Sequence, residues 1–244
     1  LVMSAILFNV SSARGASQTI KTSTNIVKSN SDRLKQQPSI GSCQGLAERV
    51  DELADGFQYT EGPAWDKRRG RWMFSDVTGD TVYGITPDGA LTRIRTQAGF
   101  PNGRAFRDDG KVVVAQHDRT LNLVEGDGSN FTRLIDSYKG KKLNSPNDVS
   151  IAKDGSTYFT DPMFGIQGYG PEKAESELGY AGIYKLVNGQ LSLLNKELAT
   201  PNGIAITNDQ RTLIVSDTST DQLFSIDLSS FSGKPCLLYT SSEP

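Results

Sequence analysis

The sequence predicts an all-β protein, in which four-stranded units repeat around a common axis as the blades of a β-propeller. The main observation is that a turn-and-strand motif occurs four times, at spacings of 41, 45 and 55 residues. Each copy opens with a polar lead residue: Glu61, Asn102, Asn147 and Asn202. The second observation is that short strand patterns and Gly-containing turns fill the intervals between the copies. A strand-and-turn repeat of about 40–50 residues is the sequence signature of propeller blades.

Composition and charge fit a globular all-β domain. The chain has 244 residues, a net charge of −2, 36% apolar residues and 24 Gly. This length is enough for a large core in one domain. The charge is close to neutral and no basic block is present, which argues against nucleic acid as a partner. Cys43 and Cys236 lack the spacing of a metal site, and they can pair only if folding brings their Cα atoms within about 7 Å.

The N-terminal region differs in character from the rest of the chain. Residues 1–16 form an apolar run that ends in small residues, and they resemble the remnant of a secretory signal peptide. Its basic start is missing, and an ordinary buried segment is the alternative; the run is too short to span a membrane. A signal peptide implies a secreted or periplasmic protein, and otherwise a cytoplasmic one is expected. The polar residues 17–41 predict a disordered linker.

The domain is expected over residues 42–244. A short amphipathic helix over 42–55 begins it. Strand patterns then run from Phe57 to Tyr239, separated by turn sequences such as Asn188-Gly189. The predicted strands, blade by blade, are 61–65, 72–76, 81–85 and 91–94, then 101–106, 112–114, 120–124 and 131–135, then 149–152, 157–160, 182–186 and 191–194, and finally 201–206, 213–215 and 222–228.

The 55-residue interval contains an insertion, residues 162–179, which is rich in Gly and acidic residues. A loop of this length inside a compact domain is often functional. One interpretation is a lid over the mouth of the propeller channel, and the alternative is a solvated surface loop.

A second polar residue follows each lead residue by 14 or 15 positions, namely Asp76, His117, Asp161 and Asp217. For Asp76 and Asp217 we expect bonds to backbone N–H groups at the strand ends. His117 is the only His in the chain. We take His117 as the candidate catalytic residue because imidazole titrates near neutral pH, and the alternative is a polar residue that closes an inner strand.

The lead motifs resemble those of a known family. EGPAWD at residue 61, PNGRAF at 101, LNSPNDV at 143 with YFTDP at 158, and PNGIAI at 201 with VSDT at 215 are similar to motifs of the gluconolactonase and regucalcin-like family. That family consists of six-bladed propellers and includes a diisopropyl-fluorophosphatase branch. The resemblance covers about residues 57–240, so we expect this chain to hold about four of six blades.

The resemblance implies one divalent cation in the central channel, held by a Glu, two Asn and an Asp. By motif, Glu61, Asn147 and Asn202 match three of these ligands. The fourth, an Asp that the family also uses as catalytic base, lies in a Pro-Asp-Gly motif of the fifth blade, and it is expected beyond Pro244. For the three Asn leads, turn chemistry alone is an alternative explanation, since Asn tolerates the left-handed conformation. Glu61 does not fit that alternative, because Glu is a poor turn residue.

The chemistry of these residues agrees with the resemblance. Carboxylate and amide oxygens suit a hard cation, so Ca²⁺ is expected, with Mg²⁺ or Zn²⁺ as alternatives. A bound cation would polarise a lactone carbonyl and favour ionisation of water. The implied substrate is a small sugar lactone, and we assign Asn102, Asn147 and Asp161 to its binding.

Two other functions remain open. The chain could be a non-catalytic propeller that binds a cation for stability, or an inactive fragment that lacks the fifth-blade Asp. Residues 57–244 suffice for about four blades at roughly 45 residues each, and a six-bladed ring needs two more. We therefore expect a chain truncated at both ends, incomplete at its C-terminus, and nearly inactive by itself.

Overall fold

The computed structural model describes residues 52–229 and 233–240. The predicted signal-peptide remnant, the linker, Cys43 and residues 42–51 of the predicted helix lie outside these ranges. Residues 52–55 form no helix, so that part of the helix prediction is wrong. All the strands described below belong to one compact unit, which continues from Ala54.

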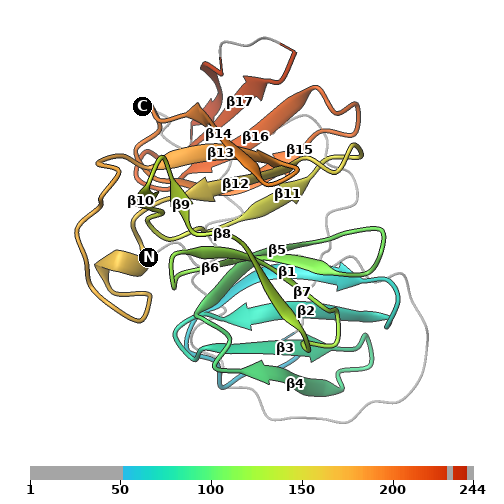
Figure 1. The fold of residues 1–244 in the computed structure, drawn as a ribbon. Helices are drawn as coiled ribbons and strands as arrows, with labels where there is room; N and C mark the ends of the chain where they lie inside the picture. Colours follow the sequence, from blue (N-terminus) through green and yellow to red (C-terminus); the bar gives the residue numbers. More distant parts are fainter. Residues whose placement is uncertain (1–51, 230–232, 241–244) are drawn as a thin grey trace. The chain divides into compact units, whose positions relative to one another are not determined.

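The first two blades are four-stranded sheets whose strands follow one another in chain order (Figure 1). Every neighbouring pair within them is antiparallel. Blade 1 consists of β1 (Thr60–Asp66), β2 (Arg71–Asp76), β3 (Thr81–Ile85) and β4 (Leu91–Thr96). Blade 2 consists of β5 (Pro101–Phe106), β6 (Val112–Gln116), β7 (Thr120–Val124) and β8 (Phe131–Ile135), and the small hairpin of β9 (Ser137–Tyr138) and β10 (Lys141–Lys142) follows it.

The next two blades repeat this antiparallel arrangement. Blade 3 consists of β11 (Val149–Ile151), β12 (Thr157–Asp161), β13 (Gly182–Val187) and β14 (Gln190–Asn195). Blade 4 consists of β15 (Pro201–Ile206), β16 (Thr212–Asp217), β17 (Gln222–Asp227) and β18 (Pro235–Thr240). The only helix among the described residues is the single turn η1 (Gly165–Gln167), inside the 162–179 insertion.

Turn chemistry explains where these strands end. Asn188 and Gly189, with φ of 49° and 78°, connect β13 to β14, and two consecutive positive φ values are what a tight hairpin requires. The hairpin predicted at this dipeptide is therefore confirmed.

The core lies between the blades, because strands in the middle of a blade bury both faces. In β12, Phe159 packs with Val113 of blade 2, while its neighbour Tyr158 packs with Leu213 of blade 4. Successive side chains of a strand point to opposite faces, so blade 3 is sandwiched between blades 2 and 4. The first strands of adjacent blades are also in contact, in the order β1, β5, β11, β15. The predicted all-β propeller is thus confirmed, with four blades in the described residues.

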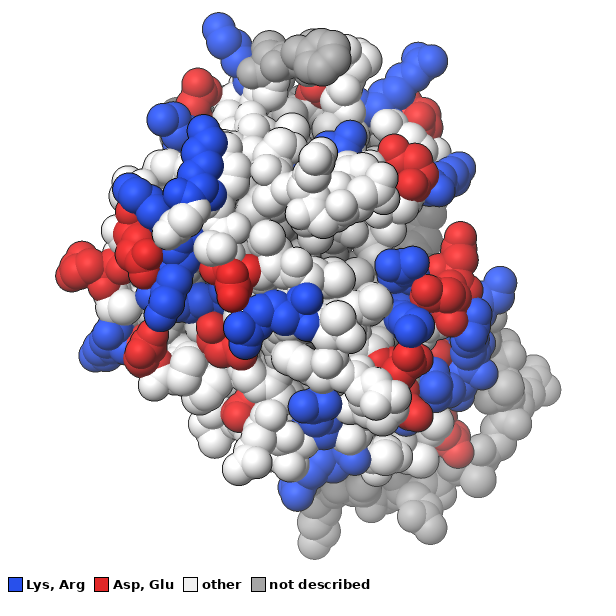
Figure 2. Space-filling view, in the orientation of Figure 1, with Lys and Arg blue, Asp and Glu red and all other residues white. Residues whose placement is uncertain are grey.

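Surface and helix features complete the description. On the face in Figure 2, basic and acidic side chains are interspersed among uncharged residues. No helix within residues 52–229 and 233–240 has both the length and the apolar character that crossing a membrane requires.

Candidate active site

Three of the four lead residues, Glu61, Asn102 and Asn202, stand where the inner strands are irregular. Pairing of β1 with β2 shifts register between Glu61 and Ala64, and that of β5 with β6 shifts between Pro101 and Arg104. The same shift occurs in β15 between Pro201 and Ile204. A bulge of this kind bends the strand and redirects its side chains, and bulges are common beside functional sites. At these bulges the lead side chains depart from the regular alternation of side chains along a strand.

The lead turns of adjacent blades touch each other. A Cβ built on Gly62 would lie 2.3 Å from the carbonyl oxygen of Asn102, and a Cβ on Gly103 would lie 2.7 Å from that of Asn147. Asp148 Oδ2 in turn accepts a hydrogen bond of 3.0 Å from the backbone N–H of Ile204. Adjacent lead motifs are therefore direct neighbours, as the sequence predicted from equivalent positions in successive blades.

Hydroxyl groups of the second strands fix the lead carbonyls of the next blade. Ser75 Oγ donates to the carbonyl oxygen of Asn102 at 2.8 Å, and Thr160 Oγ1 donates to that of Asn202 at 2.6 Å. Ser75 and Thr160 are 0% exposed. The sequence analysis did not single out these residues, although each directly precedes an Asp at the end of the second strand.

The Asp residues at the ends of the second strands of blades 1, 3 and 4 accept hydrogen bonds from backbone N–H groups, as predicted for Asp76 and Asp217. Asp76 Oδ1 accepts from the N–H of Tyr59 at 2.9 Å, and Asp217 Oδ2 accepts from the N–H of Thr200 at 3.1 Å. Asp161, assigned to substrate binding, is fully buried. Its oxygens accept from the N–H groups of Asn144 and Ser145 at 2.9 and 2.8 Å. Asp161 thus accepts the same kind of backbone hydrogen bond as Asp76 and Asp217 do, and its role in substrate binding stays a prediction.

His117 occupies the equivalent position in blade 2 but has different partners. Its Nε2 lies 2.9 Å from Asn102 Nδ2, and its Nδ1 lies 3.1 Å from the carbonyl oxygen of Tyr169. The amide N–H can only donate, so Nε2 accepts and the proton is on Nδ1. Burial lowers the pKa of His117 to about 4, so the ring is neutral at pH 7. The neutral imidazole, held on both sides, fixes the orientation of the Asn102 amide, and the catalytic role assigned to His117 stays a prediction.

The 162–179 insertion packs over this end of the blades. The ring of Tyr169 lies 5.4 Å from that of Tyr59 in blade 1, centroid to centroid. A Cβ on Gly165 would lie 2.8 Å from His117 Cβ, and Gly165 N donates to Ser145 Oγ at 2.9 Å. The insertion therefore contacts residues from blades 1, 2 and 3, and its role as a lid stays a prediction.

Glu61 lies close to these aromatic rings. The pKa of the Tyr59 hydroxyl is raised by burial first and then by the charge of Glu61 and by Tyr169. Glu61 itself is partly buried. A partly buried carboxylate near the ring of Tyr59 is set in a partly apolar environment, where its charge attracts a cation more strongly than it would in water.

The Asn side chains that were assigned as ligands each have an amide oxygen with no hydrogen-bond partner among the described residues. Asn202 Nδ2 donates to Thr218 Oγ1 at 2.8 Å, which turns its Oδ1 the other way. Asn147 is 4% exposed, and within the described ranges no residue forms a hydrogen bond with its side-chain amide. Asp148, between these two turns, accepts from Val149 N and Ile204 N, and burial raises its pKa to about 6. The structure thus assigns Asp148 a connecting role that its sequence position did not reveal.

Comparison with known proteins agrees with this geometry. Residues 59–236 match the family described as the SMP-30/Gluconolactonase/LRE-like region. The chain belongs to this family. The gluconolactonase of Zymomonas mobilis is 29% identical over 236 residues, which cover 88% of this chain and 66% of that protein. The predicted resemblance is therefore confirmed.

Solved structures of gluconolactonase-like proteins show the same fold. A gluconolactonase of Xanthomonas campestris superposes with a TM-score of 0.69 at 32% identity, over 73% of this chain and 61% of that one. A calcium-binding regucalcin of Agrobacterium tumefaciens has a TM-score of 0.59 at 20% identity, over 75% of this chain and 59% of that one, and is similar in fold. This chain spans less than two thirds of the length of these relatives.

Proposed function

We propose that this protein hydrolyses a small lactone of the sugar-lactone class at the inner ends of its blades, with a divalent cation as cofactor. The observation that carries the proposal is the direct contact between the lead turns of adjacent blades. Membership in the gluconolactonase-like family supports the same reaction class.

The donor set fits a hard cation. Glu61 contributes a carboxylate, and Asn147 and Asn202 contribute amide oxygens, which are ligands that Ca²⁺ accepts. Within the described ranges, no three His, Cys, Asp or Glu side chains form a metal-binding group, so a cation here depends on amide ligands. When bound, such an ion supplies Lewis-acid polarisation of the lactone carbonyl and favours ionisation of the attacking water.

The remaining residues bind and orient the substrate. The Asn102 amide, fixed through its nitrogen by His117, directs its Oδ1 away from the imidazole. There the Oδ1 can accept a hydrogen bond from a hydroxyl of the lactone. The rings of Tyr59 and Tyr169, inclined at 50° to each other, provide an apolar surface that limits the access of water.

The test is a hydrolysis assay on the purified protein, in which acid release from gluconolactone is followed at constant pH. We expect low activity, measurable above the spontaneous rate, which is lost on chelation and returns on addition of Ca²⁺. Glu61→Gln should lower kcat/KM at least tenfold, about 1.4 kcal/mol in transition-state stabilisation. The exposed Glu197→Gln is the matched control.

The same assay separates the two alternatives. A protein that binds Ca²⁺ by calorimetry and loses it in Glu61→Gln, but hydrolyses no lactone, is a non-catalytic cation-binding propeller. A protein that does neither contradicts both the proposed cofactor and the proposed reaction.

A further inference from the structure

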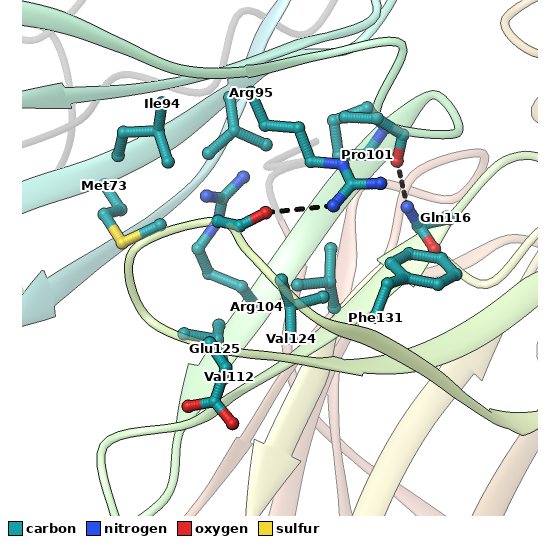
Figure 3. A pocket seen from close by; sticks show the side chains of 14 residues that line it. Met73, Ile94, Arg95, Pro101, Arg104, Val112, Gln116, Val124, Glu125 and Phe131 are labelled. Atoms are coloured by element: carbon teal, nitrogen blue, oxygen red, sulfur yellow. Dashed lines mark hydrogen bonds between the residues drawn. The ribbon is translucent and has the colours of Figure 1, made fainter.

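A small cavity lies between blades 1 and 2, and none of the four lead residues lines it (Figure 3). Its volume is about 20 Å³, which is room for one species the size of a water molecule or a monatomic ion. Apolar side chains form most of its wall, including Met73, Ile94 and Val112. Its polar lining consists of the guanidinium groups of Arg95 and Arg104, with Gln116 and Glu125.

Arg104 is the unusual member of this wall. It belongs to the inner strand β5 and is 5% exposed. Its Nη2 donates to Ser75 Oγ, but no described residue accepts a hydrogen bond from its Nε or Nη1. In Figure 3 its guanidinium points into the cavity toward Met73 and Ile94. Two donor nitrogen atoms of a buried cation, with three N–H bonds between them, thus face apolar surroundings.

Arg95 adds a second donor to the same cavity. Its Nη1 donates to the carbonyl oxygen of Gly128 at 2.9 Å, and its guanidinium carbon lies 5.1 Å from the ring centroid of Phe131. The Nε of Arg95 is buried and has no acceptor among the described residues. Arg95 and Phe131 stand on the outermost strand of each blade, so they close the cavity from outside.

Among the residues that the structure describes, no carboxylate forms an ion pair with Arg104 or Arg95. Glu125 also lines the cavity, but its carboxylate pairs with Lys111 at 2.8 Å and points away from Arg104 in Figure 3. Burial lowers the pKa of Arg104 to about 9, which leaves it charged at pH 7. An unpaired buried charge is strongly destabilising, and a counter-ion removes most of that penalty.

We propose that this cavity is an anion site, which takes a monatomic halide, chloride in ordinary solution, between the guanidinium groups of Arg104 and Arg95. The cavity is too small for a phosphate, a carboxylic acid or a lactone with its hydration shell. The site is independent of the proposed hydrolysis, and its role is to stabilise the contact between blades 1 and 2.

The test compares thermal unfolding of the full chain in sodium chloride and in sodium isethionate at the same ionic strength. Isethionate is an anion too large for the cavity. We expect the midpoint to rise with chloride concentration and to level off, with a gain on the order of 2–4 °C. In Arg104→Leu the difference between the two salts should vanish. The exposed Arg107→Leu, on the same blade, should keep it.

A direct measurement covers the case in which Arg104→Leu does not fold. Crystals of the unaltered chain soaked in sodium bromide should show an anomalous scattering peak between the two guanidinium groups. Equal midpoints in the two salts, or an absence of that peak with water refined in its place, would overturn the anion site.

Discussion

Residues at equivalent positions of the repeat have diverged in role. Asp76 and Asp217 hold the loop that leads into their own inner strand. In blade 2 a different residue does this, because Asp80 Oδ1 accepts from the N–H of Phe100 at 2.7 Å. His117 is therefore released from backbone capping, and its ring contacts Asn102 and the insertion instead.

The buried His117 predicts a loss of stability in acid. Its pKa falls from 6.5 in the unfolded chain to about 4 in the folded protein. Between these values the unfolded state binds a proton that the folded state does not, so stability is full above pH 6.5 and falls as the pH approaches 4. The contribution is on the order of 3 kcal/mol. It should appear as a difference between the protein and His117→Gln in urea unfolding at pH 7 and pH 4.5.

That comparison needs the variant because buried carboxylates respond in the opposite direction. Burial raises the pKa of Asp148 to about 6, and a raised carboxyl pKa favours the folded state as the pH falls. This contribution is common to both proteins and cancels in the difference. Parallel pH profiles for His117→Gln and the unaltered chain would mean that His117 is not held neutral.

Among the proposed ligands, Glu61 is expected to dominate cation affinity. It alone carries a formal charge, and the charge count of the ligands tunes Ca²⁺ affinity. Glu61→Gln should weaken Ca²⁺ binding by about tenfold or more, whereas Asn102→Ala, in a residue assigned to the substrate, should change it by less than about threefold. Isothermal calorimetry measures both, and equal affinities would argue against Glu61 as a ligand.

At the scale of elements, the inner-strand bulges bring adjacent blades close together. Gly62 has φ of 57°, and its Cα lies against the carbonyl of Asn102 in the next blade. Both the left-handed conformation and the missing side chain are needed there. The bulge and its glycine thus act together. The bulge orients the Glu61 side chain, and the glycine allows blade 2 to pack closely against blade 1.

Gly62→Ala should therefore destabilise the protein strongly. Gly89, in the turn between β3 and β4, also has a positive φ of 89°, but a Cβ there meets nothing within 4 Å. Gly89→Ala should show the conformational penalty alone, about 1–2 kcal/mol. Gly62→Ala should cost at least 2 kcal/mol more in urea unfolding, because its Cβ would collide with backbone. Similar losses for both variants would mean that the blades can move apart at this point.

At the scale of the whole molecule, the blades differ in how completely they are covered. Every residue of β6 and of β12 is buried, since each lies in a blade with a neighbour on both faces. In β16 of blade 4 buried and half-buried residues alternate, and Leu237 and Leu238 of β18 are 50% and 52% exposed. Blade 4 is thus covered mainly on the face toward blade 3.

Hydrogen exchange should follow this difference. Backbone amides in β6 and β12 should exchange most slowly, because opening them exposes two packed faces. Amides of β16 and β17 should exchange about tenfold faster or more, corresponding to an opening free energy lower by about 1.4 kcal/mol. Deuterium uptake measured by mass spectrometry on peptides from these strands tests this, and equal protection would indicate one uniformly cooperative unit.

The sequence by itself determined the blades and much of the local chemistry. The spacing of the lead motifs predicted the repeat, turn dipeptides such as Asn188-Gly189 predicted the hairpins, and the Asp at the end of a second strand predicted the backbone cap. These features depend on residues that are close in the chain, where periodicity and turn preference are expressed directly. The contact between the lead turns of adjacent blades also followed, because equivalent positions of successive blades adjoin.

Only the tertiary structure decided which polar groups meet between blades. The contact of His117 with Tyr169, 52 residues away, and that of Asp148 with Ile204, 56 residues away, depend on how separate blades stack. The charge of Arg104, in a strand that otherwise reads as a regular repeat, became informative only when its buried surroundings were known. Local patterns carry no signal for such contacts, because burial and partner distance are set by the packing of one blade on the next.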